Sequence, residues 1–114
     1  MEDEKRSVRY EVVAALAASG EEGAVPPLCQ GLLDRDAGMR RLVAETLGKL
    51  GAVKAIPELE NACGDRHPQV RQAALLALAQ IGTDDLLAFL LAAAKDADVQ
   101  VRDTAIRLLS DFDE

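Results

Sequence analysis

The sequence has few of the residues on which disulfide frameworks, metal sites and redox sites depend. It contains two cysteines, one histidine and no tryptophan in 114 residues. One pair of cysteines is not a disulfide framework, and Cys29 and Cys63 both stand at apolar positions of expected helices. We therefore expect two buried free thiols, a cytoplasmic location, and neither a metal nor another cofactor.

Long apolar runs and an excess of basic residues are also missing. The longest apolar run, Leu86 to Ala94, has nine residues, whereas a membrane-spanning helix needs about 20. Five of the first seven residues are charged, and this segment lacks the apolar stretch of a secretory signal. Thirteen basic residues against 20 acidic ones give a net charge of −7. This balance disfavours nucleic acid and anionic membranes as partners, because both bind mainly through positive charge.

What the sequence does contain is a repeat of 31 residues without insertions. A shift by this length aligns aspartates, arginines, leucines and glycines: Asp3, Asp34, Asp65 and Asp96; Arg9, Arg40, Arg71 and Arg102; Leu16, Leu47, Leu78 and Leu109; Gly20, Gly51 and Gly82. A fixed period of this kind indicates stacked units, none of which buries its apolar face alone. We expect one domain made of units 3–33, 34–64 and 65–95 and a half unit 96–114.

Each unit is expected to form two helices. In the third unit, Pro68 suits a first helical turn, and apolar residues recur at helical spacing up to Ile81. Gly82 follows at the place where a left-handed glycine ends a helix. Shorter second helices are expected at about 24–33, 54–63 and 84–95. The pattern predicts an all-α fold, a right-handed α-solenoid of about three and a half two-helix repeats.

Two short motifs within this pattern resemble a known family. Leu47 to Gly51 reads LGKLG and Ala55 to Leu59 reads AIPEL. Together with the preceding aspartate and the Val-Arg pair, they resemble the short HEAT-like repeat of the phycobilisome-lyase (PBS lyase) type. The resemblance covers nearly the whole chain and implies a helical solenoid. It implies little about function, because such repeats serve as scaffolds in very different proteins.

The recurring arginines are expected to have a structural role. Each stands one residue after a core-facing apolar residue, at the edge of the buried stripe, where its stem can lie on apolar surface and its guanidinium can reach an acceptor. Candidate acceptors precede each first helix, and the expected partners are Arg9, Arg40, Arg71 and Arg102 with Asp34, Asp65 and Asp96. We predict an aspartate–arginine ladder between neighbouring units. The alternative is a row of arginines that binds phosphate or other anions.

Two further aspartates before the first helices are interpreted as helix caps and not as metal ligands. Asp36 and Asp98 directly precede the helices expected to begin at Ala37 and Val99, where a side-chain oxygen accepts from open helix N–H groups. His67 holds the equivalent place before Pro68. With no cysteine near it in sequence, His67 is not expected to bind zinc or to act in catalysis.

The sequence does not point to an enzyme. No serine lies in a nucleophile elbow, and no glycine-rich phosphate loop follows a predicted strand. Glu58 and Glu60 could flank a substrate, but a solvated helix face explains them better. We therefore expect a non-catalytic protein–protein interaction scaffold that binds a partner through the face of its second helices.

The third unit has the most apolar second helix. Phe89 is expected on its outward side, opposite a core stripe formed by Val25, Ile56 and Leu87. With Leu86 and Ala93 at the edge, an apolar patch there would contact a partner, a second copy of the chain or a following unit. The alternative is that Phe89 folds over its neighbours. Acidic residues around this surface, including Glu58 and Glu60, would steer a partner with a basic rim. The last half unit would also need a cover, either further repeats or a homodimer.

Two rival functions remain open. One is a regulatory or chromophore-lyase-like protein that handles a phycobilin or another tetrapyrrole, although the chain lacks an aromatic pocket and an exposed reactive cysteine. The other is a nucleic-acid-binding HEAT-like protein, which would need a basic inner groove. The acidic residues of the second helices disfavour that reading.

Overall fold

The structure is a computed structural model that describes residues 2–112, and every regular element among them is helical. In chain order the elements are α1 (Glu2–Ser19), η1 (Glu22–Ala24), α2 (Val25–Gln30), η2 (Gly31–Leu33), α3 (Ala37–Leu50), η3 (Val53–Ala55), α4 (Ile56–Ala62), α5 (Pro68–Ile81), α6 (Leu86–Ala93) and α7 (Val99–Asp111), where η marks a short 3-10 helix. The predicted all-α fold is confirmed.

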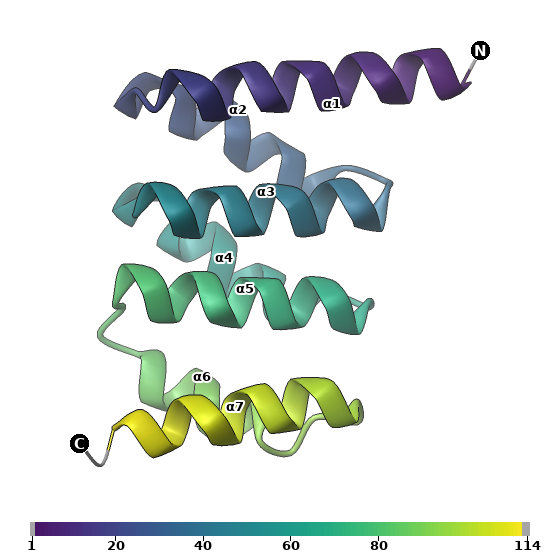
Figure 1. Ribbon diagram of the computed structural model, residues 1–114. Helices are drawn as coiled ribbons and strands as arrows, with labels where there is room; N and C mark the ends of the chain where they lie inside the picture. The colour runs from purple at the N-terminus through teal and green to yellow at the C-terminus, as the bar shows by residue number, and fades with distance from the viewer. Residues whose placement is uncertain (1, 113–114) are drawn as a thin grey trace.

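The helices form two layers. The first helices of the units, α1, α3, α5 and α7, lie side by side in one layer, and the shorter α2, α4 and α6 form the other (Figure 1). Each helical pair stacks on the next, which gives an elongated body of 46 × 28 × 17 Å. The 31-residue period therefore corresponds to one two-helix unit of an α-solenoid.

The ends of the first helices follow the chemistry of their flanking residues. Gly20, Gly51 and Gly82 adopt positive φ values of 63°, 63° and 84° directly after α1, α3 and α5. A side chain at these positions would be strained, so glycine ends the helix and lets the chain turn into the second helix. The sequence prediction for all three glycines is confirmed.

The helix starts differ from unit to unit. The Asp36 carboxylate accepts from the backbone N–H of Gly38 at 3.0 Å, and the Asp98 carboxylate accepts from Gln100 and Val101 at 3.0 and 3.2 Å. Both predicted caps are thus present. The side chain of His67 makes no capping hydrogen bond to α5.

The core lies between the two layers and repeats in register. Leu28, Leu59 and Leu90, one from each second helix, are fully buried. Leu47 and Leu78 are their fully buried counterparts on α3 and α5. Because the residues come from successive units, the core is continuous along the stack, and each unit depends on its neighbours for burial.

The layer of first helices is held close at one point by a glycine. A Cβ atom added to Gly48 of α3 would lie 2.8 Å from the Cα atom of Ala77 on α5. No ordinary side chain fits at that separation. The approach of α3 to α5 therefore depends on the absence of a side chain at this position.

One core prediction is wrong. Leu87 is in register with Val25 and Ile56 and was expected in the same buried stripe, but it is 47% exposed. Val25 packs beside η3 of the next unit. The described chain has no equivalent segment after α7, so nothing in it covers Leu87. Burial at this position depends on the following unit and not on the pattern of the helix itself.

Candidate functional site

Three arginine–aspartate pairs of the predicted ladder join successive units. The Nε atom of each arginine donates to a carboxylate oxygen of the next unit: Arg9 to Asp34 at 2.8 Å, Arg40 to Asp65 at 2.8 Å and Arg71 to Asp96 at 2.9 Å. The Nη2 atoms donate to the second carboxylate oxygens at 3.3, 3.2 and 2.8 Å. This two-pronged geometry is the strong form of an arginine–carboxylate contact.

The same aspartates also organise the turns that precede the first helices. Each carboxylate accepts from the backbone N–H two residues later, at 2.9 Å from Asp36, His67 and Asp98 in turn. The backbone carbonyls of Asp34, Asp65 and Asp96 accept from Nη1 of Arg40, Arg71 and Arg102 at 2.7, 2.9 and 2.8 Å. A continuous network of hydrogen bonds therefore connects neighbouring units.

The pKa values of the ladder aspartates follow from this network. The hydrogen bond from Arg71 is the main reason that the pKa of Asp96 lies below its ordinary value. Burial alone would raise the pKa of Asp65, but hydrogen bonds from Arg40 and from the His67 backbone outweigh it and lower that pKa. Because Arg9, Arg40 and Arg71 each face a carboxylate, the geometry favours the structural ladder over an anion-binding row.

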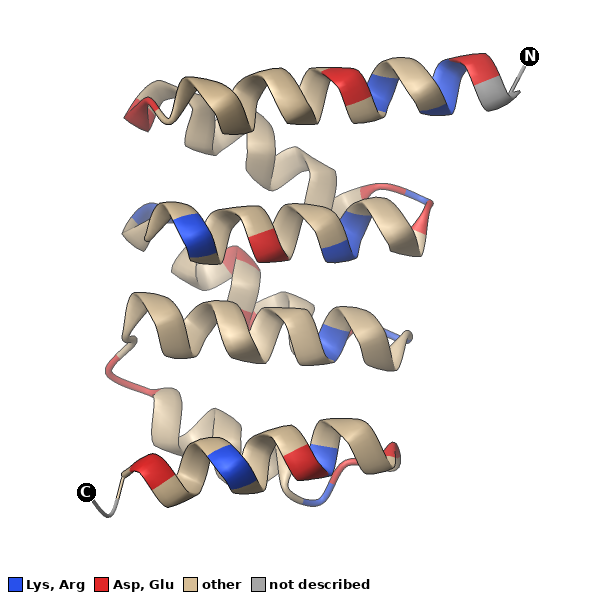
Figure 2. Cartoon of the chain, in the orientation of Figure 1, with Lys and Arg blue, Asp and Glu red and all other residues tan. Residues whose placement is uncertain are grey.

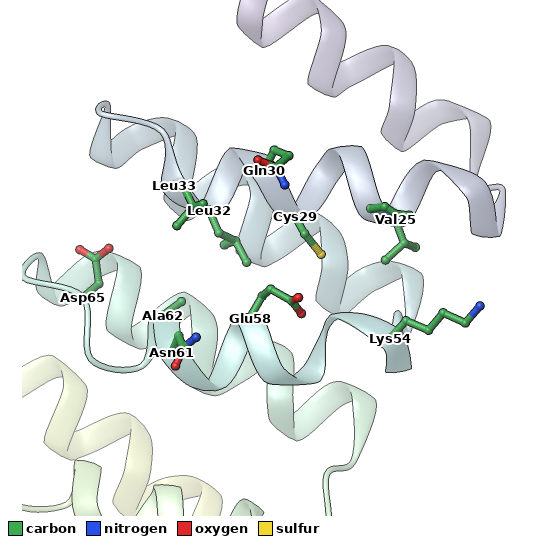
Figure 3. A pocket seen from close by; sticks show the side chains of 11 residues that line it. Val25, Cys29, Gln30, Leu32, Leu33, Lys54, Glu58, Asn61, Ala62 and Asp65 are labelled. Atoms are coloured by element: carbon green, nitrogen blue, oxygen red, sulfur yellow. The ribbon is translucent and has the colours of Figure 1, made fainter.

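The layer of second helices contains two grooves. The α2–α4 groove has a volume of about 540 Å³ and is lined by Val25, Pro26, Cys29, Gln30, Leu32, Leu33, Lys54, Glu58, Asn61, Ala62 and Asp65. Its floor includes the buried residues Leu32 and Ala62, whereas Leu33 at its edge is 81% exposed. Figure 3 shows Cys29 of α2 and Glu58 of α4 facing each other across the groove.

The α4–α6 groove lies one unit further along and is smaller, at about 370 Å³. Its lining includes Glu60 and Cys63 from the second unit and Phe89 and Ala93 from α6. Phe89 is half-buried and packs against the hydrophobic core. The ring therefore occupies space that the α2–α4 groove leaves open.

The structure does not bring the five predicted binding residues to one surface. Glu58 and Glu60 leave α4 on opposite sides and enter different grooves, so they do not flank one substrate. Phe89 and Ala93 share the α4–α6 groove with Glu60. Leu86 lines a separate hollow with residues of α5 and α7.

The expected outward position of Phe89 is also wrong. In the alignment of the 31-residue repeats, Phe89 corresponds to Glu58, and both positions face the second helix of the preceding unit. An apolar ring at that position gains more from packing between the units than from contact with water. Phe89 therefore folds over its neighbours, which was the alternative reading of the sequence.

The charges of this layer are mainly negative. Within their bounds α2, α4 and α6 carry no lysine or arginine, and α4 carries Glu58 and Glu60 (Figure 2). Lys54 of η3 lines the α2–α4 groove, but its amino group lies 3.5 Å from the carboxylate of Glu22. The carboxylate of Glu58 makes no hydrogen bond or ion pair with another described residue.

Both cysteines are free thiols with raised pKa values. Burial, and secondarily the negative charge of Glu58, raises the pKa of Cys29. Burial and the charge of Glu60 raise the pKa of Cys63 to about 12. Since the thiolate is the reactive form, neither residue is an activated nucleophile near neutral pH.

One cluster was missed by the sequence analysis. Asp36 caps α3, but its carboxylate also accepts from the Tyr10 hydroxyl at 2.8 Å and lies 3.0 Å from Nε of Arg6. Tyr10 is 26 residues from Asp36, and this spacing is close to that of the ladder pairs. Tyr10 directly follows Arg9 in the sequence, so this polar residue could have indicated the contact with Asp36.

Two kinds of site are absent from the described part of the chain. Among the side chains that the structure describes, those of residues 4–112, no group of three or more His, Cys, Asp or Glu could hold a metal ion. No helix within residues 2–112 is long and apolar enough to cross a membrane.

Comparison with known proteins agrees with this architecture. None of the curated proteins matches the chain. The structure of human deoxyhypusine hydroxylase in complex with glycerol is similar, with 34% sequence identity and a TM-score of 0.79 over 90% of this chain. The similarity spans only 36% of the hydroxylase chain. The family model for HEAT repeats matches residues 1–66 and 56–114, and the chain therefore belongs to the HEAT-repeat family.

Proposed function

We propose that the chain is a non-catalytic protein-interaction scaffold whose partner binds along the second helices. HEAT repeats generally mediate protein interactions. The observation that carries the proposal is the pair of grooves beside α4, each of which combines apolar side chains with one glutamate. Apolar contact area with a few polar groups at the rim is typical of protein interfaces.

The arrangement of titratable groups supports a binding role over catalysis. General acid–base chemistry needs groups that converge on one substrate position. Here Glu58 and Glu60 lie in different grooves, and the thiols of Cys29 and Cys63 have raised pKa values. The chain spans about a third of the similar hydroxylase, so the activity named for that enzyme is not carried over.

A library of proteins displayed from human or bacterial open reading frames, selected for binding to this protein, would test the scaffold proposal. Purified protein serves as bait, and selected clones are tested again with Glu58→Lys/Glu60→Lys and with Glu11→Lys, an exposed change on the other layer. We expect the double variant to lose binding and Glu11→Lys to retain it. Partners that bind all three proteins equally, or a failure to select any partner, would contradict the proposal.

A second proposal follows the finer resemblance to phycobilisome-lyase repeats. The α2–α4 groove, at about 540 Å³, has a size typical of small-molecule sites, and it contains the thiol of Cys29. The raised pKa of that thiol argues against covalent attachment of a chromophore. Titration with a free bilin, followed by its absorbance, would support this role if the spectrum shifts with wild-type protein and not with Glu58→Lys.

Nucleic-acid binding is less favoured than either role. Such binding depends on basic residues that neutralise phosphates, and the second helices carry none within their bounds. A cytoplasmic location and a possible homodimer stay predictions. Sedimentation over a range of protein concentrations would detect self-association directly.

A further inference from the structure

The two grooves differ at one register position in a way that changes their shape. Glu58 in the α2–α4 groove corresponds to Phe89 in the α4–α6 groove. Phe89 packs into its groove and becomes half-buried, whereas Glu58 remains exposed. The volumes agree with this difference, at about 540 Å³ for the α2–α4 groove and about 370 Å³ for the other. The α2–α4 groove is therefore the larger of the two.

The middle of this larger groove carries negative charge. Figure 3 places Lys54 at one end, Asp65 at the other and Glu58 between them. Lys54 lies near Glu22, and the charge of Asp65 is balanced by its ion pair with Arg40. Glu58 has no such partner among the described residues. A positively charged group in the middle of the groove would meet a carboxylate that no other residue neutralises.

Apolar surface surrounds this carboxylate. The buried residues Val25 and Leu32 line the groove, and Cys29 faces Glu58 from α2. Leu33 is 81% exposed at the edge of the groove. An occupant with an apolar side chain over Leu33 would remove this surface from water, which stabilises a complex in proportion to the area covered.

We propose that the α2–α4 groove binds a peptide segment of a protein partner that places an arginine or lysine beside Glu58 and an apolar side chain over Leu33. This inference rests on the proposed scaffold function and specifies the chemistry of its partner. An arginine suits the site because its stem lies on apolar walls while its guanidinium forms a two-pronged contact with a carboxylate. The acidic residues of the layer then favour the approach of a basic segment.

A random library of displayed peptides, selected against the wild-type protein, tests this chemistry. We expect the selected peptides to be enriched in arginine or lysine next to leucine, isoleucine or phenylalanine. One selected peptide is then labelled, and its dissociation constant is measured by fluorescence anisotropy. Glu58→Gln should weaken its binding by about tenfold, as expected for the loss of a charge-assisted hydrogen bond.

Matched variants separate the two parts of the contact. Leu33→Ser should also weaken binding by several-fold, because it removes the apolar edge, and its exposed position keeps the fold intact. Glu60→Gln in the α4–α6 groove and Leu91→Ser on exposed surface of α6 are the corresponding controls, and both should leave binding within about twofold. Urea unfolding of each variant shows whether the fold is preserved.

The two cysteines provide a footprint of the bound peptide. A peptide in the α2–α4 groove should slow the alkylation of Cys29 and leave the rate of Cys63 unchanged, as measured by mass spectrometry. Protection of Cys63 alone, or binding that is insensitive to Glu58→Gln, would overturn this inference but not the scaffold function. Protection of Cys29 by increasing protein concentration alone would identify a second copy as the occupant and would also overturn it. If no peptide is selected and no protein partner is found, both proposals fail.

Discussion

Arg40 and Asp65 form a two-pronged ion pair between adjacent units, with Nε 2.8 Å from Oδ2 and Nη2 3.2 Å from Oδ1. The two side chains are only 6% and 12% exposed. The third guanidinium nitrogen, Nη1, donates to the backbone carbonyl of Asp34. Arg40 therefore connects the turn before its own helix to the turn before the next one.

This pair makes Arg40→Ala a direct test of the ladder. The change leaves the Asp65 carboxylate in a partly buried position without its cation, so we expect the free energy of unfolding to fall by about 3 kcal/mol. The neighbouring Arg41 is exposed and pairs with Glu45 on its own helix, so Arg41→Ala should cost less than about 0.5 kcal/mol. Equal effects of the two changes in urea unfolding would show that the ladder contributes nothing to stability.

The ladder and the Asp36 cap together predict that the protein loses stability in acid. The pKa values of Asp36, Asp65 and Asp96 are all lowered in the folded state, so the unfolded chain takes up protons first as the pH falls. The stability from these carboxylates is complete above the unfolded pKa of about 3.9 and is lost as the pH falls through the lower folded values.

Urea unfolding between neutral pH and about pH 2.5 would measure this loss. Asp65→Asn removes one of the three groups, so its stability should depend less steeply on pH than that of the wild type, whatever its stability at pH 7. An identical slope in the variant would mean that Asp65 is not stabilised as a carboxylate by Arg40.

Gly48→Ala tests the close approach of α3 and α5. Alanine has the higher helix propensity by about 1 kcal/mol, but its Cβ atom would lie 2.8 Å from the Cα atom of Ala77. Because backbone must move to make room, we expect a net loss of at least about 1 kcal/mol of stability. At Gly23 an added Cβ meets nothing within 4 Å, so Gly23→Ala should be neutral or slightly stabilising in the same thermal or urea unfolding experiment.

Glu58→Gln tests the geometry of the α2–α4 groove without any ligand. The negative charge of Glu58 contributes to the raised pKa of Cys29, so its removal should lower that pKa and speed the alkylation of Cys29 at mildly alkaline pH. Cys63 should not respond, because the charge that raises its pKa comes from Glu60. The reciprocal Glu60→Gln should accelerate Cys63 alone, and a change of both thiols by either variant would contradict the separation of the two grooves.

The repeat made several local features predictable. A glycine after α1, α3 and α5, an aspartate before α3 and α7 and an arginine beside a buried residue each act within a few residues of the chain. Gly51, Asp36 and Asp98 therefore behave as the sequence indicates. The Asp–Arg pairs are equally regular because both residues recur with the same period.

The second helices were less predictable for a physical reason. They span six to eight residues, and a side chain on such a helix is covered mainly by the next or the preceding unit. Phe89 and Leu87 exchange their expected roles because α4 stands on one side of α6 and the described chain has no second helix on the other. The pattern within the helix carries no information about that difference.

The sequence by itself determined the period, the helix ends and the residues that pair between units, because these depend on local backbone chemistry repeated every 31 residues. Only the tertiary structure decided that Glu58 and Glu60 enter separate grooves. It also decided that the α2–α4 groove has the larger volume, because Phe89 packs into the α4–α6 groove. Groove shape is set by the spacing and contact of helices from different units, and that contact exists only after the units have stacked.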